Sequence, residues 1–225
     1  AADSMKTKLN TVRKLLPVQT PTSNLVTPTP AEQPYGISPW NYTGTEGEDF
    51  TDADYTEELV DWVLVSFRTE VEAAAEVSRT AALLLSNGNV DFVDRCALDL
   101  SQNIDSVYAV VEHRNHIGVM TPYKIPILNG VLTYDFTLQD SYKDPTSYGQ
   151  KQLAPDVWGM FCCDGNQQDI PSFDINGNDK TIWFDSNGFF DLYIPADYNM
   201  DGDINGADKA IWVENNGISS RVPKY

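Results

Sequence analysis

Oxygen-bearing side chains recur at close, regular intervals near the end of this chain. Over twelve residues they occupy positions 1, 3, 5, 9 and 12, with a glycine at position 6, in the order Asp197, Asn199, Asp201, Gly202, Asn205 and Asp208. The residue at position 7, Asp203, would add its main-chain carbonyl oxygen. A hard cation such as Ca²⁺ takes about six to eight oxygen ligands, and this spacing supplies most of them from one turn. The stretch therefore predicts a calcium site, and the alternative is an ordinary solvated turn rich in Asp, Asn and Gly.

A short helix is expected directly after this loop, over residues 207–214. It would carry Ile211 and Trp212 inward and stop at Asn216-Gly217, a favourable left-handed end. The same pattern occurs upstream, because residues 174–183 repeat residues 203–212 at a spacing of 29. The chain therefore contains an internal duplication of loop and helix.

The first half of the upstream loop departs from the calcium pattern. Counting back from Asp179 as position 12 places Gln168 at position 1, where a carboxylate is needed. A set of oxygen ligands is restored if Asp164 and Asn166 serve as positions 1 and 3 and a few extra residues bulge out before Asp174 and Asn176. The upstream loop is then either a second calcium site or a metal-free structural twin.

The duplicated unit resembles the type I dockerin repeat, in which a calcium loop ending in Asp is followed by one helix. The resemblance covers residues 161–217 and implies two short helices beside paired calcium loops. The partner-binding pair of a dockerin lies at loop positions 10 and 11. These positions hold Gly206-Ala207 and Gly177-Asn178 here, and neither pair looks like a recognition doublet.

Composition limits the classes of partner. The chain has 225 residues, 41% of them hydrophobic, and a formal net charge of -18. This acidity disfavours nucleic acids and anionic membrane surfaces. No apolar run is long enough to insert into a membrane. The three cysteines, Cys96, Cys162 and Cys163, permit one disulfide between Cys96 and either member of the vicinal pair, or three buried thiols.

Three regions follow from the pattern of residues along the chain. Residues 1–34 predict an amphipathic helix near 4–16 and an extended arm rich in Pro and Thr. Residues 35–160 contain about eight short β-type runs separated by turns, which predicts an antiparallel β-sandwich, Ig-like or jelly-roll-like. One run is 131–136, and Asn87-Gly88 predicts a hairpin between the runs 81–85 and 90–93. Residues 69–77 favour a helical turn. Residues 161–225 form the expected dockerin-like α module, so the chain as a whole is mostly β.

The search for catalytic groups yields little. His113 and His116 would face opposite sides of a regular strand and could share a metal only if a turn or bulge intervened. Glu112 and Asp135 are a conceivable carboxylate pair, although no spacing supports it. We therefore expect that the protein is not an enzyme; a hydrolase built from dispersed carboxylates is the alternative.

Aromatic residues early in the β region offer a second kind of site. Flat rings can stack on sugars, so these residues could form a carbohydrate-binding platform, although core positions are their commoner use. The candidates are Tyr35, Trp40, Tyr42, Tyr55 and Trp62.

The succession of short motifs along the chain resembles the C-terminal region of large surface proteins of bacteria that use type IX secretion. The motifs are Lys8-Leu-Asn, Leu15-Leu-Pro, Gln33-Pro-Tyr, Pro39-Trp-Asn-Tyr-Thr-Gly-Thr-Glu, Asp61-Trp-Val-Leu-Val, Leu83-Leu-Leu-Ser-Asn-Gly, Glu112-His-Arg-Asn-His, Thr133-Tyr-Asp-Phe-Thr and the calcium repeats. The resemblance implies a secreted, extracellular β-sandwich with a calcium module at its end, and no catalysis. We accordingly expect a structural or adhesion module, such as a subunit of a surface filament, whose partner is a protein or a second copy. A carbohydrate-binding module is the alternative.

Overall fold

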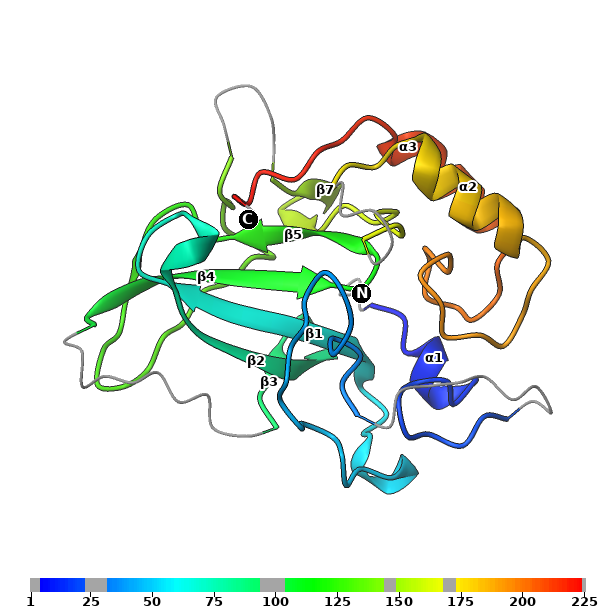
Figure 1. Cartoon of the computed structure of the whole chain (residues 1–225), viewed down its shortest axis with the longest axis horizontal. Helices are drawn as coiled ribbons and strands as arrows, with labels where there is room; N and C mark the ends of the chain where they lie inside the picture. The colour runs from blue at the N-terminus through cyan, green and yellow to red at the C-terminus, as the bar shows by residue number, and fades with distance from the viewer. Residues whose placement is uncertain (1–4, 23–31, 94–103, 144–148, 168–172, 224–225) are drawn as a thin grey trace.

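A computed structural model of the chain describes residues 5–22, 32–93, 104–143, 149–167 and 173–223 (Figure 1). The described residues are mostly β, with antiparallel pairing throughout and few helices. This confirms the mostly β, antiparallel class. Cys96 and much of the Pro/Thr arm lie outside the described residues.

A six-stranded sheet forms the centre of the molecule. Its strands follow the order β3-β2-β1-β4-β5, and β6 lies off this path and pairs with the first residues of β4, Ser106 and Val107. The bounds are β1 Leu59–Arg68, β2 Glu76–Leu85, β3 Val90–Asp91, β4 Ser106–His113, β5 His116–Met120 and β6 Ile125–Pro126. A separate hairpin joins β7, Lys151–Ala154, to β8, Val157–Gly159. The structure thus shows one large sheet and one small hairpin, where the sequence predicted about eight short strands arranged as a sandwich.

Both faces of the large sheet are covered, as the alternation of side chains along β1 shows. Trp62 and Leu64 contribute to a core with Leu9, Leu15 and Leu16 from the N-terminal region. Val63, Val65 and Phe67 point to the other face and pack with Val107, Ala109 and Ile125. Because successive side chains of a strand alternate, β1 is buried along its whole length and lies at the centre of two cores.

The N-terminal helix is shorter than predicted. Helix α1 covers Lys8–Thr11, and Lys14 follows it with a φ of 54°, in the left-handed region that ends a helix. The chain turns there because Leu15 and Leu16 are both fully buried, which two adjacent residues on a helix cannot easily achieve. The apolar spacing at 4–16 thus reflects burial in a bent segment.

Two other short elements differ from the predictions. The run 131–136, predicted as a strand, forms only the isolated pairing of Leu128 with Val131. Its end is turned by Asp135, whose carboxylate accepts hydrogen bonds from the main chain and hydroxyl of Thr137. The region 69–77, predicted to hold a helical turn, contains the 3₁₀ turn η2 at Ala73–Ala75, and a second 3₁₀ turn, η1, covers Asp52–Asp54.

Two helices of ten residues complete the fold, α2 at Gly177–Ser186 and α3 at Gly206–Asn215. They contact each other at one end of the molecule, in gold and red in Figure 1. Each helix has an asparagine as its N-cap, Asn176 or Asn205, and is followed by a glycine, Gly188 or Gly217, with a φ of 95°. These are the helices and ends that the duplicated sequence predicts.

Candidate metal centre

The loop from Asp197 to Asp208 is closed by its first and last carboxylates. Asp197 accepts main-chain hydrogen bonds from Asp201 at 3.0 Å and Gly202 at 2.7 Å. Gly202 has a φ of 85°, which glycine adopts without strain, and a Cβ there would lie 3.0 Å from Leu15 Cδ1. The predicted glycine at position 6 therefore serves both the turn and its close contact with the N-terminal segment.

Asp208 holds the two ends of the same loop together. Its Oδ1 accepts hydrogen bonds from the main-chain N–H groups of Tyr198 and Asn199 at 2.9 and 3.1 Å. Its Oδ2 accepts one from Asn205 at 2.8 Å, while the Asn205 side chain accepts one from Ala207. Asp208 and Asn205 thus form a capping box at the start of α3, so the local sequence ties the loop to the helix.

The upstream loop is built in the same way. Asp179 accepts hydrogen bonds from the main-chain N–H groups of Gly165 at 2.8 Å, Asn166 at 3.2 Å and Asn176 at 2.7 Å. The equivalence places Asp164 where Asp197 lies, at position 1. Both Asp164 and Asn166 are buried. The structure therefore brings Asp164 and Asn166 beside Asp179, in the register that an insertion before Asp174 requires, while residues 168–172 lie outside the described residues.

The two units also hold each other. Trp183 Nε1 donates to the carbonyl oxygen of Asn205 at 2.7 Å, and Trp212 Nε1 donates to that of Asn176 at 2.9 Å. Gly188 N donates to Ile204 O and Gly217 N donates to Ile175 O, at 2.9 and 2.8 Å. Each contact has a counterpart 29 residues away. The duplication thus gives a nearly two-fold arrangement in which each loop is held by the helix of the other unit.

Three carboxylates of these loops have pKa values raised by burial. Burial raises the pKa of Asp197 to about 7. The charge of Arg114 and two main-chain hydrogen bonds lower this pKa, but by less than burial raises it. Burial likewise raises the pKa of Asp179 and of Asp208. The amide oxygen of Asn199, at position 3, is buried without a hydrogen-bond partner among the described residues. Buried negative groups and an unpaired oxygen are chemistry that a calcium ion would satisfy.

The acidic side chains of the loops are spaced apart and partly paired with cations of the N-terminal segment. Within the described ranges, no three His, Cys, Asp or Glu side chains are gathered as a metal-binding group. A loop of this kind also draws ligands from Asn side chains and main-chain carbonyls, so its oxygens are not all carboxylates. Asp201 at position 5 pairs with Lys8 Nζ at 3.2 Å, and Asp203 pairs with Arg13 at 2.6 Å. The N-terminal segment thus supplies two cations to the outer side of loop 197–208, which sequence spacing alone did not indicate.

The histidines are brought together rather than separated. His113 and His116 pair across the turn between β4 and β5, with ring centroids 4.6 Å apart. Their Nδ1 atoms are 2.9 Å apart, and His113 Nε2 lies 3.1 Å from Asp61 Oδ2. The expectation that they face opposite sides holds for a continuous strand and is wrong here because Arg114 and Asn115 form a turn. The pair is used in an internal hydrogen-bond chain.

Asp61 is the centre of that buried network. Besides His113, its carboxylate contacts Arg114 Nε at 3.0 Å, Tyr193 Oη at 2.7 Å and the main chain of Trp62 at 2.8 Å. Burial alone would raise the pKa of Asp61, but the charge of Arg114 and the hydrogen bonds of His113 and Tyr193 hold it well below its usual range. This network joins β1, the β4–β5 turn and the segment before loop 197–208.

The remaining candidates from the sequence are separated or buried. Glu112 is buried, whereas Asp135 is exposed and bonded within its own turn. The sugar-stacking platform predicted from the sequence is wrong, because Tyr35, Trp40, Tyr55 and Trp62 are core residues whose rings pack against one another. Tyr42, the fifth candidate, is partly buried against the same core and donates to Glu46. Cys162 and Cys163 are free thiols with sulfur atoms 3.6 Å apart.

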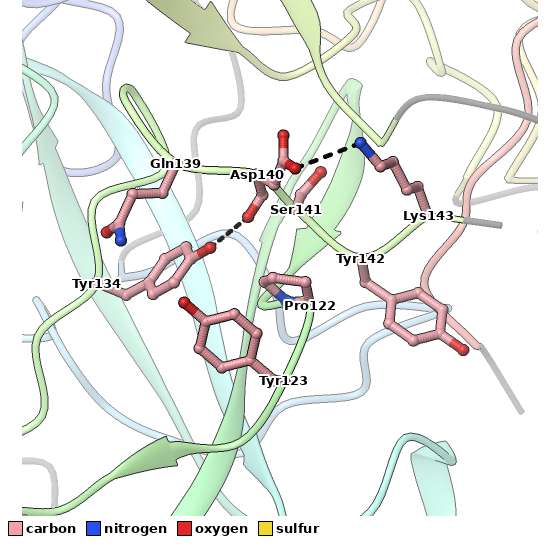
Figure 2. A pocket seen from close by; sticks show the side chains of 8 residues that line it. All are labelled: Pro122, Tyr123, Tyr134, Gln139, Asp140, Ser141, Tyr142 and Lys143. Carbon is pink, nitrogen blue, oxygen red and sulfur yellow. Dashed lines mark hydrogen bonds and ion pairs between the residues drawn. The ribbon is translucent and has the colours of Figure 1, made fainter. Parts of the chain in front are cut away.

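A different group of aromatic residues lines an open cavity of about 530 Å³ (Figure 2). Tyr123 is 57% exposed and its ring lies edge to face with that of Tyr134, at 6.4 Å between centroids. Burial raises the pKa of Tyr134 to about 12, and its hydroxyl donates to the carbonyl oxygen of Asp140. The polar side of the cavity is formed by Gln139, Asp140, Ser141 and Lys143.

Comparison with known proteins gives little. No family model and no curated protein matches the chain. Two solved structures are similar to it, both of a type II cohesin–X-dockerin complex from Acetivibrio cellulolyticus. The N-terminal interface mutant aligns with a TM-score of 0.39 and 17% identity over 70% of this chain and 82% of that chain. The C-terminal interface mutant aligns with a TM-score of 0.38 and 16% identity over the same shares. A likeness this distant carries no argument about the fold or function of this chain.

Proposed function

We propose that this chain is a noncatalytic, calcium-stabilised extracellular module with a structural or adhesive role. The observation that carries the proposal is the pair of equivalent loops, closed by Asp208 and Asp179 through the same three main-chain hydrogen bonds each. Such a preformed frame needs only a cation to balance its buried carboxylates. The C-terminal unit is accordingly proposed to be a dockerin-like module.

The second loop has the more complete set of oxygens for Ca²⁺. They come from the side chains of Asp197, Asn199, Asp201, Asn205 and Asp208 and from the main chain of Asp203. The upstream loop would use Asp164, Asn166, Asp174, Asn176 and Asp179. When bound, the ion would neutralise the carboxylates and fix the loop, so its contribution is to stability and not to a reaction.

The proposed partner is a protein, either a second copy of this chain or another surface protein. Among the described residues, Phe184, Phe189, Phe190 and Val213 of the calcium module are more than half exposed. Phe184 and Val213 are also equivalent in the duplication, since 29 residues separate them. Exposed apolar groups of this size favour contact with another protein. We further propose that the irregular segments over the large sheet complete a β-sandwich. The sequence also predicts that the Pro/Thr arm at 18–34 extends the sheet of a neighbour. Gln19 and Gln33, near the two ends of that arm, are instead buried in this chain's own structure.

No helix among the described residues has the length and apolar character needed to cross a bilayer. The charge of -18 continues to disfavour nucleic acid as a partner. The extracellular setting is proposed from the resemblance to secreted surface proteins and from the abundance of free calcium outside cells.

Calorimetric titration with Ca²⁺ and thermal unfolding in excess chelator test the proposal. At a free calcium concentration of about 100 times the dissociation constant, the ion should stabilise the fold by about 2.7 kcal/mol. For a chain of this length that is a shift in Tm of about 5–10 °C. No heat of binding together with an unchanged Tm in chelator would defeat the proposal. Electron microscopy of native material would separately test self-assembly, which uniformly single particles would contradict.

A carbohydrate-binding function is the second candidate, now at the cavity of Tyr123. An exposed ring beside amide, carboxylate, hydroxyl and ammonium groups suits a sugar, whose apolar face stacks and whose hydroxyls need polar partners. A glycan array followed by titration of the Tyr123→Ala variant tests it. Binding that the variant does not reduce, or an array without signal, removes this candidate.

A further inference from the structure

We propose that Asn115, in the turn between β4 and β5, is a positioning residue for the calcium loop 197–208. The inference rests on the proposed function of that loop. It goes further, because it assigns part of the site to a residue of the central sheet, 82 residues upstream of the first ligand. The consequence is that calcium binding and the folding of the sheet stabilise each other.

The contacts of Asn115 carry the proposal. Its side chain is fully buried, and Nδ2 donates to the carbonyl oxygen of Asp197 at 2.7 Å and to that of Pro195 at 3.1 Å. Asp197 is the residue at position 1, whose side chain must point into the loop. The hydrogen bond from the Asn115 amide to the carbonyl oxygen of Asp197 fixes the main chain that carries the Asp197 carboxylate.

The turn that presents Asn115 is itself rigidly held. Arg114 donates to the carbonyl oxygen of Ile194 at 2.6 Å and is paired with Asp61 at 3.0 Å. The guanidinium also lies over the ring of Tyr193, 4.2 Å from its centroid. The turn is thus anchored in the sheet on one side and holds residues 193–197 on the other, which preorganises the start of the loop.

The upstream loop is attached to the same turn by different atoms. The carbonyl oxygen of Asn115 accepts hydrogen bonds from the main-chain N–H groups of Cys163 and Asp164 at 2.9 and 3.1 Å. The side chain of Gln167 donates to the carbonyl oxygens of His113, His116 and Asp164 at 3.2, 3.1 and 3.0 Å. The side chain of Asn115 therefore serves loop 197–208, and that of Gln167 serves the upstream loop.

This division provides a matched control. Asn115→Ala and Gln167→Ala each remove a buried amide that touches the same turn, but only the first loses a contact with Asp197. Loss of an outer partner of a metal ligand weakens binding by about 10- to 100-fold. Asn115→Ala should weaken calcium binding at loop 197–208 by that factor, whereas Gln167→Ala should change it by less than about threefold.

The experiment is calorimetric titration of the full chain with Ca²⁺. Asp201→Ala, which removes the side-chain oxygens at position 5 of loop 197–208 alone, identifies the binding step of that loop. If Asn115→Ala folds only with calcium, the calcium midpoint of folding by circular dichroism replaces the affinity. If it does not fold at all, Asn115→Ser is measured in its place. A folded Asn115 variant that binds as tightly as wild type, or equal losses in the Asn115 and Gln167 variants, would overturn the inference. A wild-type chain that binds no calcium would instead defeat the proposed function.

Discussion

Replacing Asp208 or Asp179 by alanine separates the architectural role of each closing carboxylate from its role as a ligand. Both side chains are fully buried and accept three main-chain hydrogen bonds. Truncation leaves three N–H groups without their acceptor, and each lost bond costs about 1 kcal/mol. In chelator we therefore expect each variant to lose about 3 kcal/mol of unfolding free energy.

In calcium, the two variants need no longer lose the same amount of unfolding free energy. With Ca²⁺ at about 100 times the dissociation constant, Asp208→Ala loses a further 2.7 kcal/mol or so, because it no longer benefits from the bound ion. Asp179→Ala loses a comparable amount only if the upstream loop also binds calcium. The difference between the two variants, with and without chelator, thus decides between a second site and a metal-free twin.

Urea unfolding followed by tryptophan fluorescence is suited to this comparison, because Trp183 and Trp212 both lie in the module. Asp185→Ala makes the same charge change at an exposed position of α2 and should have little effect. The reasoning fails if Asp208→Ala costs less than about 1 kcal/mol in chelator. A loss that is the same in calcium as in chelator would refute the assignment of Asp208 as a ligand.

Two further predictions concern charges outside the loop oxygens. Asp61→Asn leaves Arg114 buried without its partner and should cost about 3–5 kcal/mol near neutral pH. Because the pKa of Asp61 is lowered in the folded state, its contribution is present above pH of about 4 and is lost as the pH falls through the folded value. Urea unfolding from pH 7 to 3 should therefore show the gap between wild type and variant narrowing in acid, and a constant gap would contradict the network. Lys8→Met removes an ammonium group 3.2 Å from Asp201 and should strengthen calcium binding, measured by calorimetry, a few-fold. Lys6→Met, at an exposed position, is the control and should leave the affinity unchanged. Weaker binding in Lys8→Met would contradict this prediction and show that the Lys8–Asp201 pair supports the site.

Local signals account for the parts of the fold that the sequence predicted well. The helix expected at 207–214 is α3 at Gly206–Asn215, because Asn205 and Asp208 form its capping box and Gly217 its end. The hairpin expected around Asn87-Gly88 joins β2 to β3, and Gly88 has the required positive φ of 88°. Both features are decided by a few adjacent residues, so no distant contact was needed to find them.

Tertiary context decided the elements that were predicted wrongly. The run 131–136 has residues typical of a strand, yet it packs Leu132 and Tyr134 onto the sheet as an irregular cover. The apolar spacing at 4–16 likewise serves a bent segment that inserts Leu9, Leu15 and Leu16 into the core. Hydrophobic periodicity indicates which residues are buried. It indicates a helix or strand only where the main chain also finds the hydrogen-bond partners of that element.

The candidate site divides in the same manner. The predicted oxygens of each loop are close in sequence, so spacing could find them, and the register with Asp164 and Asn166 could be found from the duplication. Asn115 and Lys8 contact loop 197–208 from other parts of the chain. No spacing rule connects such residues to a loop, and the compact Glu112-His-Arg-Asn-His116 motif was the one signal in the sequence that this turn is unusual.

The contacts across the predicted region boundaries bear on how calcium could act on the whole chain. Leu9 and Leu15 of the first region, Trp62 of the sheet and Tyr193 of the third region belong to one core. Tyr193 also donates to Asp61. Because residue 193 lies only four positions before the first predicted ligand, order in loop 197–208 is transmitted directly to a core shared by all three regions. Calcium bound there would therefore be expected to raise the stability of the sheet together with that of the module, as one cooperative unfolding transition. Hydrogen exchange at the amides of β1 should slow on adding calcium; protection confined to residues 161–223 would show that the shared core does not couple them.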